Sequence, residues 1–379
     1  MSFSRSQYIS SGVKRGISLE ILTRDAEYIE NLSTVGLFPL LSLNQLSYVT
    51  NKDYFYLRRI VQRRNISSVY NTFEIPKQNG KLRSICSPES DLYDVQKWIL
   101  ENILENRPRS LSSFAYHKHI SIKDAASAHV GSTWAFKIDF QDFFTNIKEK
   151  QVFKLFRSLG YAPLISFELS RLCTFDIALA NSNNLNTFPY KKSIDSHLPQ
   201  GAPTSGAISN LIAWKLDEIL IDFSKRNNLT YTRYADDLIF SSREKFNRNQ
   251  ISTLIHSVYQ ISIFHNFKIN TKKTIIIPPG KNLEVLGINV TQLGLKVRKT
   301  LLNDLEFHIK MSKAYSLETH SYYKGFKSPF GFINYINGNL GYVKMIDETK
   351  YIKLIDDWED SLKEFYSSMV MSPIPASWL

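Results

Sequence analysis

Apolar residues along this chain change repeatedly between the alternation of a strand and the spacing of a helix. Residues 134–139 (WAFKID) alternate, with three apolar side chains on one face and Lys137 and Asp139 on the other. Residues 229–242 (LTYTRYADDLIFSS) form two β-rich arms around an acidic turn. Residues 71–88 contain two further β-rich runs joined by a Gln-Asn-Gly turn. The pattern therefore predicts a strand and two hairpins.

Helices are predicted between these strands, where apolar residues recur at intervals of three and four. One covers residues 52–66, and others follow Pro88, end at Gly160 and begin at Thr204. The apolar stripes of the last three are Leu92, Val95, Ile99 and Ile103; Val152, Phe153, Phe156 and Leu159; and Ile208, Ile212, Leu216, Ile219 and Phe223. Residues 176–198 are polar and irregular, which predicts a surface loop. From about residue 291 we expect mixed helix and loop, ending in a loose tail.

The composition adds a class of partner. The 379 residues hold 47 Lys and Arg against 35 Asp and Glu, a net charge of +12, with 43% hydrophobic residues. That fraction supports a large core and excludes wholesale disorder. With no apolar run long enough for a membrane span and no signal peptide, we expect a soluble cytoplasmic protein without a membrane partner. Cys86 and Cys173 suggest neither a zinc site nor a disulfide. The positive charge favours a nucleic-acid partner, although solvated lysines alone would also produce it.

The acidic residues suggest a metal site. Asp236 and Asp237 sit at the tip of the predicted hairpin, where two like charges are unfavourable unless a cation neutralises them. An Asp-Asp pair is often only a turn, but both arms here are apolar and would hold the pair at the edge of a buried sheet. Asp139 ends a second strand with the same apolar backing. Three carboxylates on neighbouring strands suit a pair of Mg²⁺ ions, which catalyse in-line phosphoryl transfer.

These acidic segments resemble the sequence boxes of reverse transcriptases. YADD (234–237) resembles their YxDD box, FKIDFQDFF (136–144) the preceding acidic motif, and LPQGAPTSGAISN (198–210) the glutamine-glycine motif between them. INTKKT (269–274) is similar to the lysine motif, EVLGINV (284–290) to the primer-gripping hairpin, and IPKQNGKLRSICSP (75–88) to the fingers hairpin. The resemblance covers roughly residues 50–345.

The resemblance implies an α+β right-hand polymerase and a role for each matching residue. Its parts would be an N-terminal extension (1–49), fingers (50–133), a palm of antiparallel sheet and helices (134–280), and a thumb with a C-terminal tail (281–379). The catalytic residues would be Asp139, Asp236 and Asp237, which with the Phe140 carbonyl would bind two Mg²⁺ ions. The dNTP contacts would be Lys77, Arg83, Phe144, Gln200 and Lys273.

Several of these roles have plain alternatives. Lys81 competes with Lys77 for the triphosphate, and Lys273 would otherwise be a solvated lysine. Phe144 matches the bulky gate that excludes a 2′-hydroxyl, and its alternative is a core aromatic. The helix over 52–66 carries Arg58, Arg59, Arg63 and Arg64, which we interpret either as nucleic-acid contacts or as a solvated helix face.

Within the family, the chain resembles the retron type of bacteria. LCTF (172–175) and GFINYINGNLGYVKMI (331–346) match the retron layout. Retrons usually show Asn-Ala-x-x-His where residues 125–129 are AASAH, and Val-Thr-Gly where Leu286 replaces the Thr. His129 is then either a structural histidine or an RNA contact.

A retron enzyme copies a structured noncoding RNA, with dNTPs, into a small RNA-linked single-stranded DNA. The resemblance also implies antiphage defence with a separate effector protein. The alternatives are a non-retron defence-associated reverse transcriptase, an RNA-dependent RNA polymerase, and a polymerase-shaped nucleic-acid scaffold without turnover. Ala235 and Phe144 argue against the RNA polymerase, and the complete set of aspartates argues against the scaffold.

Overall fold

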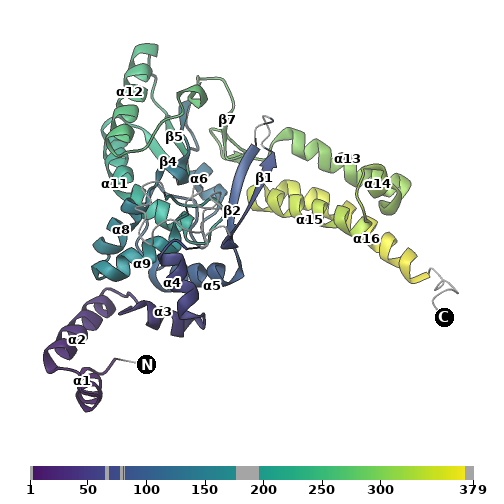
Figure 1. The fold of residues 1–379 in the computed structure, drawn as a ribbon. Helices are drawn as coiled ribbons and strands as arrows, with labels where there is room; N and C mark the ends of the chain where they lie inside the picture. Colours follow the sequence, from purple (N-terminus) through teal and green to yellow (C-terminus); the bar gives the residue numbers. More distant parts are fainter. Residues whose placement is uncertain (1–2, 65–67, 77–79, 81, 176–195, 372–379) are drawn as a thin grey trace.

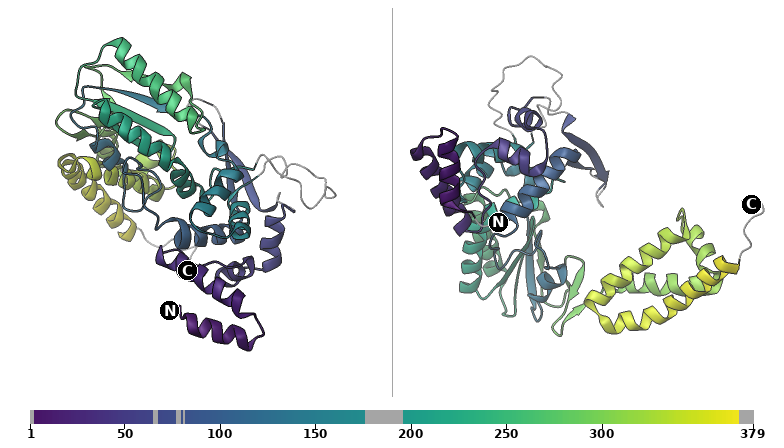
Figure 2. Two further views of the ribbon diagram at one scale, coloured as in Figure 1. Left: turned by 90° about the vertical axis from the view of Figure 1, so that its left-hand side faces the viewer. Right: turned by 90° about the horizontal axis from the view of Figure 1, so that it is seen from below.

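The chain forms a central body with helical extensions at two ends (Figure 1). The computed structural model describes residues 3–64, 68–76, 80, 82–175 and 196–371, with side chains described as far as residue 368. The N-terminal helices lie at one end and the C-terminal helices at the other, as Figure 1 and the right-hand view of Figure 2 show. In the described ranges, no helix combines the length and the apolar character needed to cross a membrane.

The N-terminal part is helical. Its elements are α1 (Arg5–Lys14), α2 (Leu19–Thr34), α3 (Leu43–Thr50) and α4 (Tyr54–Val61). The helix predicted over 52–66 is therefore shorter at both ends. Asp53 begins it, because its side chain accepts a hydrogen bond from the Tyr56 backbone N–H at 2.7 Å. It cannot continue through Arg63, which has a positive φ of 58°.

A hairpin projects from the body, as predicted for residues 71–88. Strand β1 (Tyr70–Pro76) pairs antiparallel with β2 (Leu82–Pro88), and Ile75 lies opposite Arg83. Of the predicted turn, Gln78 and Asn79 lie outside the described residues. The chain then continues through α5 (Ser90–Ile99), the π-helical η2 (Leu100–Leu104) and α6 (Ile122–Ser127).

The centre of the body is a four-stranded antiparallel sheet. Its strands are β3 (Trp134–Asp139), β4 (Thr230–Tyr234), β5 (Asp237–Ser242) and β6 (Ile275–Ile277), in the order β4-β5-β3-β6. The predicted strand at 134–139 and the predicted hairpin at 229–242 are both confirmed. Successive side chains of β3 and β5 point to opposite faces of the sheet. Nearly all of them are buried, so both faces are covered.

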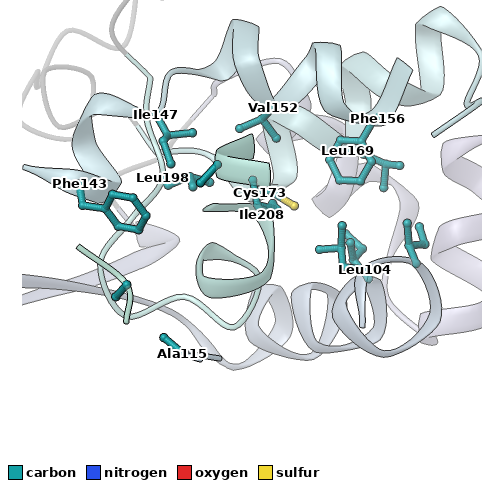
Figure 3. Packing of buried hydrophobic residues seen from close by; sticks show 14 of the residues in the cluster. Leu104, Ala115, Phe143, Ile147, Val152, Phe156, Leu169, Cys173, Leu198 and Ile208 are labelled. Atoms are coloured by element: carbon teal, nitrogen blue, oxygen red, sulfur yellow. The ribbon is translucent and has the colours of Figure 1, made fainter. Parts of the chain in front are cut away.

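Helices pack around this sheet. They are α7 (Phe143–Asn146), α8 (Glu149–Ser158), α9 (Pro163–Cys173), α11 (Ser205–Arg226) and α12 (Arg248–Phe264), followed by the 3₁₀ turn η3 (Thr271–Lys273). The helix predicted from Thr204 is α11, and the helix predicted to end at Gly160 is α8. One continuous apolar core joins these helices to the sheet and to α3–α5, and Figure 3 shows part of it. Most of the predicted loop, residues 176–195, lies outside the described residues.

The C-terminal part begins with a small sheet of β7 (Leu283–Val285), β8 (Ile288–Val290) and β9 (Leu295–Lys296). It continues as α13 (Lys299–Tyr315), α14 (Leu317–Tyr323), α15 (Pro329–Ile346) and α16 (Glu348–Met371). The helices expected after residue 291 are present, and the described chain after Arg298 has only short loops between them. Residues 372–379 of the expected loose tail lie outside the described residues. These helices share a second apolar core that includes Ile336 and Trp358 and reaches Ile277 of the palm sheet.

His129 is a structural histidine, one of the two interpretations of the AASAH segment. Its ring is fully buried, with Nδ1 2.7 Å from the Ser241 hydroxyl and Nε2 2.7 Å from the Thr232 hydroxyl. These hydroxyls lie on β5 and β4, so one ring ties the segment after α6 to both strands of the β4–β5 hairpin. Burial, helped by the charge of Lys137, lowers the pKa of His129 to about 4.

The lowered pKa of His129 predicts acid sensitivity. The unfolded state takes up a proton near the ordinary histidine pKa, whereas the folded state does so only near pH 4, so stability is lost as the pH falls between these values. From about pH 7.5 to pH 5 this linkage amounts to about 2 kcal/mol of unfolding free energy. Urea unfolding across this range should show a smaller loss for His129→Gln than for wild type. The exposed His256→Gln serves as a control that should follow wild type.

Candidate active site

The β4–β5 hairpin and the neighbouring strand β3 place the predicted aspartates at one edge of the sheet. Asp139, the last residue of β3, lies directly opposite Asp237, the first residue of β5. Asp236 occupies the two-residue turn between Tyr234 and Asp237. Its backbone carbonyl accepts a hydrogen bond from the Phe140 N–H at 3.0 Å. Strand pairing and this bond together bring the three carboxylates to one place, as the sequence predicted.

The turn itself is tight. Ala235 has a positive φ of 55° and is only 6% exposed, so a small side chain is needed at a position where glycine would be least strained. The rest of the site is held from the other side of β3. There the Asn270 N–H donates to the Asp139 carbonyl at 2.8 Å, and the Gln141 N–H donates to the Lys268 carbonyl at 2.8 Å. The lysine motif therefore lies against the end of β3.

A buried ion pair that the sequence analysis missed supports this turn. Arg233 of β4 and Asp217 of α11 are both completely buried, with the guanidinium 2.6 Å from one carboxylate oxygen and 2.8 Å from the other. The same guanidinium donates to the Ala235 carbonyl at 3.2 Å and to Asn210 Oδ1 at 2.9 Å. Tyr231 donates its hydroxyl proton to Asp217 at 2.8 Å. Arg233 thereby fixes the backbone just before the aspartates.

The carboxylates repel one another. Desolvation, followed by the charges of Asp236 and Asp139, raises the pKa of Asp237 to about 6, against an ordinary value of 3.8. Desolvation also raises the pKa of Asp236, with a further contribution from Asp139. Lys273 offsets part of this charge, because its ammonium group lies 2.7 Å from Asp139 Oδ2. The charge of Lys137 also lowers the pKa of Asp237, but the two lysines do not cancel the upward shift, so the fold concentrates negative charge at this edge of the sheet.

The oxygen donors suit Mg²⁺, but they are not arranged as a closed metal cage. Among the described residues, no three His, Cys, Asp or Glu side chains are placed to hold a metal ion. One carboxylate oxygen of Asp139 is occupied by Lys273. The mutual repulsion of the aspartates is nevertheless the electrostatic condition that a divalent cation relieves. The set fits the metal chemically, and the second carboxylate oxygen of Asp139 is not bonded to Lys273.

Of the predicted dNTP-contacting residues, Lys273 and Arg83 lie within electrostatic reach of these carboxylates. Gln200 and Gly201 lie against the fingers hairpin, because the Cys86 N–H donates to the Gln200 carbonyl at 2.7 Å. Gly201 has a φ of +120°, and a Cβ atom there would lie 2.9 Å from Ile85, so only glycine fits. Arg83 is exposed on β2, and its charge lowers the pKa of Asp236. Lys77 and its competitor Lys81 lie outside the described residues.

Phe144 lies at the rim of the core. It is half-buried in α7, with its ring centroid 5.4 Å from that of Phe143 and 6.0 Å from that of Tyr116. Phe143 beside it is a core aromatic, 4% exposed, as predicted. The partial exposure of Phe144 is compatible with a gate and distinguishes it from a fully buried packing residue.

The arginine cluster divides into buried and exposed members. The prediction of a nucleic-acid contact is wrong for Arg63, whose side chain is 3% exposed and pairs with Glu149 at 2.8 Å. Its guanidinium also donates to the Thr174 carbonyl at 2.7 Å, so it joins α4 to the α8–α9 region. Arg58 lies 3.7 Å from Glu168 and is half-exposed. Arg59 and Arg64 are exposed and remain candidates for phosphate contacts.

Repulsion at the aspartates predicts that Asp237→Asn stabilises the metal-free protein. Because the pKa of Asp237 is higher in the folded state than in the unfolded state, the free energy of unfolding decreases as the pH rises from about 4 through about 6. This loss of stability is present at neutral pH and nearly absent near pH 4. In EDTA, the melting temperature of Asp237→Asn should exceed that of wild type at about pH 8, and the difference should shrink as the pH falls below 6 and nearly vanish at about pH 4. Added Mg²⁺ should raise the melting temperature of wild type but not of Asp237→Asn. Asp222→Asn, at an exposed position, is the control and should melt like wild type with and without Mg²⁺. An equal rise in melting temperature with Mg²⁺ in wild type and in Asp237→Asn would contradict a metal role for Asp237.

The ion pair predicts separable effects on stability and activity. Arg233→Met alone leaves Asp217 buried without its partner and should cost about 3–5 kcal/mol of unfolding free energy. The triple variant Arg233→Met, Asp217→Leu and Tyr231→Phe removes the charges together and should melt near wild type. Because the Ala235 carbonyl then lacks its donor, primer extension should still fall at least tenfold. A triple variant with both wild-type melting and wild-type extension would show that the pair does not position the turn.

Comparisons with known proteins agree with this arrangement. The family model "Reverse transcriptase (RNA-dependent DNA polymerase)" matches residues 75–290. This range includes β2 and the strands β3, β4 and β5 that position the three aspartates. The chain is 28% identical to the retron Ec86 reverse transcriptase of Escherichia coli, over 88% of this chain and 93% of that protein. It is 30% identical to the retron Ec73 reverse transcriptase of the same species, over 74% of this chain and 84% of that protein.

Two further similarities cover smaller shares of the matched proteins. The chain is 32% identical to the retron Mx162 reverse transcriptase of Myxococcus xanthus, over 68% of this chain and 55% of that protein. A solved telomerase structure from Candida albicans, in complex with a fragment of telomeric RNA, aligns with a TM-score of 0.41 at 13% identity, over 78% of this chain and 57% of that one. On the family match and the retron relatives, this chain belongs to the reverse transcriptase family, as a bacterial retron-type RNA-directed DNA polymerase with a right-hand fold.

Proposed function

We propose that this protein copies a structured noncoding RNA into a short single-stranded DNA that stays joined to the RNA. The observation that carries the proposal is the convergence of Asp139, Asp236 and Asp237 at the edge of the sheet, in a chain whose relatives are retron enzymes. We infer that these aspartates are the catalytic residues. With the Phe140 carbonyl, they would hold two Mg²⁺ ions, which would activate the attacking hydroxyl and stabilise charge on the phosphate.

The surrounding residues would position the nucleotide. Arg83 presents a planar guanidinium beside the aspartates and would bind the triphosphate, together with Lys77 of the same hairpin. Gln200 would contact the nucleotide from the loop that holds β2. Phe144 would close the side of the sugar that carries a 2′-hydroxyl in ribonucleotides.

Lys273 would serve the leaving pyrophosphate. Burial lowers its pKa, but the hydrogen bond and charge of Asp139 outweigh that effect, so the pKa of Lys273 lies above the ordinary lysine value. A lysine that stays protonated at neutral pH can neutralise the pyrophosphate or donate a proton to it. The Lys273 side chain is more than half exposed beside Asp139, so its ammonium group would be able to reach the pyrophosphate.

We extend the proposal to the division of the chain and to its partners. The extension (1–49), fingers (50–133), palm (134–280) and thumb with tail (281–379) would enclose the nucleic acid. Arg58, Arg59 and Arg64 would add phosphate contacts along α4. Resemblance to retron enzymes supports priming from a 2′-hydroxyl, a role in antiphage defence and a separate effector protein.

A related defence-type reverse transcriptase is the second candidate. It is favoured by the two departures from the retron pattern, Ala125 in place of Asn and Leu286 in place of Thr. Such an enzyme would use the same carboxylates to make a different DNA product. The two candidates therefore differ in the product, and the catalytic site does not distinguish them.

The test is to identify the nucleic acid that the protein makes in its native host. Wild type should copurify with a defined RNA covalently joined to a discrete single-stranded DNA, seen on a denaturing gel as a band that RNase shortens. Asp236→Asn should carry the RNA without the DNA, because charge stabilisation by the metal site supplies most of the rate.

Each other result excludes part of the proposal. Heterogeneous or unlinked DNA in wild type would favour the defence-type enzyme. RNA without any DNA in wild type would favour the scaffold interpretation. If Asp236→Asn kept a tenth of wild-type primer extension in vitro, the assignment of the aspartates would be wrong.

A further inference from the structure

Tyr116 is an exposed aromatic residue in a constrained loop between η2 and α6. Its side chain is 52% exposed, and its backbone has a positive φ of 59°, which is unusual for a bulky residue. The loop is anchored on both sides of the ring. Asn210 of α11 donates to the Ala115 carbonyl at 2.7 Å, and the His117 ring lies 3.1 Å from the Ser113 hydroxyl. A strained and well-anchored residue that still exposes its ring is a candidate for a functional contact.

The first turn of α11 is shaped to receive this ring. A Cβ atom built on Gly206 would lie 2.5 Å from Tyr116 Cγ and 2.7 Å from its Cδ1. Any larger residue at position 206 would therefore displace the ring. Gly206 belongs to the same LPQGAPTSGAISN motif as Gln200, so one motif supplies both a predicted nucleotide contact and the surface on which Tyr116 rests.

The other side of Tyr116 faces the catalytic centre. Its ring centroid is 6.0 Å from that of Phe144, with the planes tilted by 57°. Burial, followed by the charges of Asp236 and Tyr234, raises the pKa of Tyr116 to about 12, and Arg83 acts in the opposite sense. The ring thus lies within electrostatic reach of the catalytic aspartate and of the cation proposed to bind the triphosphate.

With the roles proposed above for Arg83 and Phe144, Tyr116 would lie beside the sugar of a bound nucleotide. The sugar lies between the triphosphate, assigned to Arg83, and the base, and its 2′ edge faces Phe144 in the proposed function. Tyr116 also lines a cavity of about 290 Å³ together with His117, Asn210 and Trp214. Without the Tyr116 ring, the sugar site would open into that cavity and gain room for a hydroxyl group.

We propose that Tyr116 is a specificity-determining residue, whose ring continues the wall formed by Phe144 and packs against the deoxyribose of the incoming dNTP. The inference rests on the gate role proposed for Phe144. The phenol ring, rather than its hydroxyl, carries the effect, because exclusion of a 2′-hydroxyl is a matter of occupied space. The selectivity of the enzyme for deoxynucleotides is therefore set by two aromatic residues from different parts of the chain.

The experiment measures kcat/KM for dCTP and for CTP in single-nucleotide primer extension. Tyr116→Ala should lower the preference for dCTP at least tenfold, and Tyr116→Phe should keep it within about twofold of wild type. Tyr48→Ala is the matched control, because it removes a tyrosine ring that is 86% exposed and distant from Tyr116 in the sequence. It should leave the preference for dCTP unchanged. An unchanged preference in Tyr116→Ala, with reduced but measurable extension, would overturn the proposal.

Two further variants keep the proposal testable if Tyr116→Ala folds poorly. Gly206→Ala pushes the ring from behind without touching the nucleotide, and it should also change the preference for dCTP. The double variant Tyr116→Leu/Phe144→Leu should lose less preference than the product of the single losses, because both rings form one wall. A loss in Phe144→Leu with none in Tyr116→Leu or Gly206→Ala would leave the gate with Phe144 alone. A loss in neither position would refute the role proposed for Phe144 as well.

Discussion

Electrostatic repulsion among three aspartates is the constraint on which the rest of this structure depends. Desolvation, followed by the charges of Asp236 on the turn and of Asp139 opposite, raises the pKa of Asp237 to about 6, so the metal-free fold is held against its own charge. Such a site survives only where the backbone is fixed by other interactions. The pairing of the surrounding strands therefore holds the three aspartates in place against their mutual repulsion.

The supporting interactions come from segments far apart in the sequence. Arg233 and Asp217 form a buried pair that holds the Ala235 carbonyl, and His129 joins the hydroxyls of β4 and β5. On the opposite side, the lysine motif bonds to the end of β3 and places Lys273 on Asp139. Each contact involves a buried polar group, and losing one partner would leave the other unpaired at considerable cost. This mutual dependence gives the turn a single arrangement.

The basic residues of the chain do two different jobs. Arg63 and Arg233 are buried and satisfy carboxylates inside the protein, whereas Arg59, Arg64 and Arg83 are exposed. The buried arginines are paired with carboxylates and add little to the net charge of +12. That charge is therefore carried mainly by exposed residues. The exposed arginines are the ones available to a polyanion, and their salt-dependent attraction to phosphates would add to the contacts made in the active site.

The sequence by itself determined the elements that depend on local pattern. Alternation predicted β3 to the residue, the two hairpins followed from turn chemistry, and the order of motifs brought Asp139, Asp236 and Asp237 together before any coordinates. Only the tertiary structure decided what surrounds Arg63, His129, Tyr116 and the Arg233–Asp217 pair. A charged or aromatic residue has the same local pattern whether it meets solvent, a buried partner or a ligand. That difference depends on which distant segment packs against it, as Glu149 does for Arg63 and Gly206 does for Tyr116.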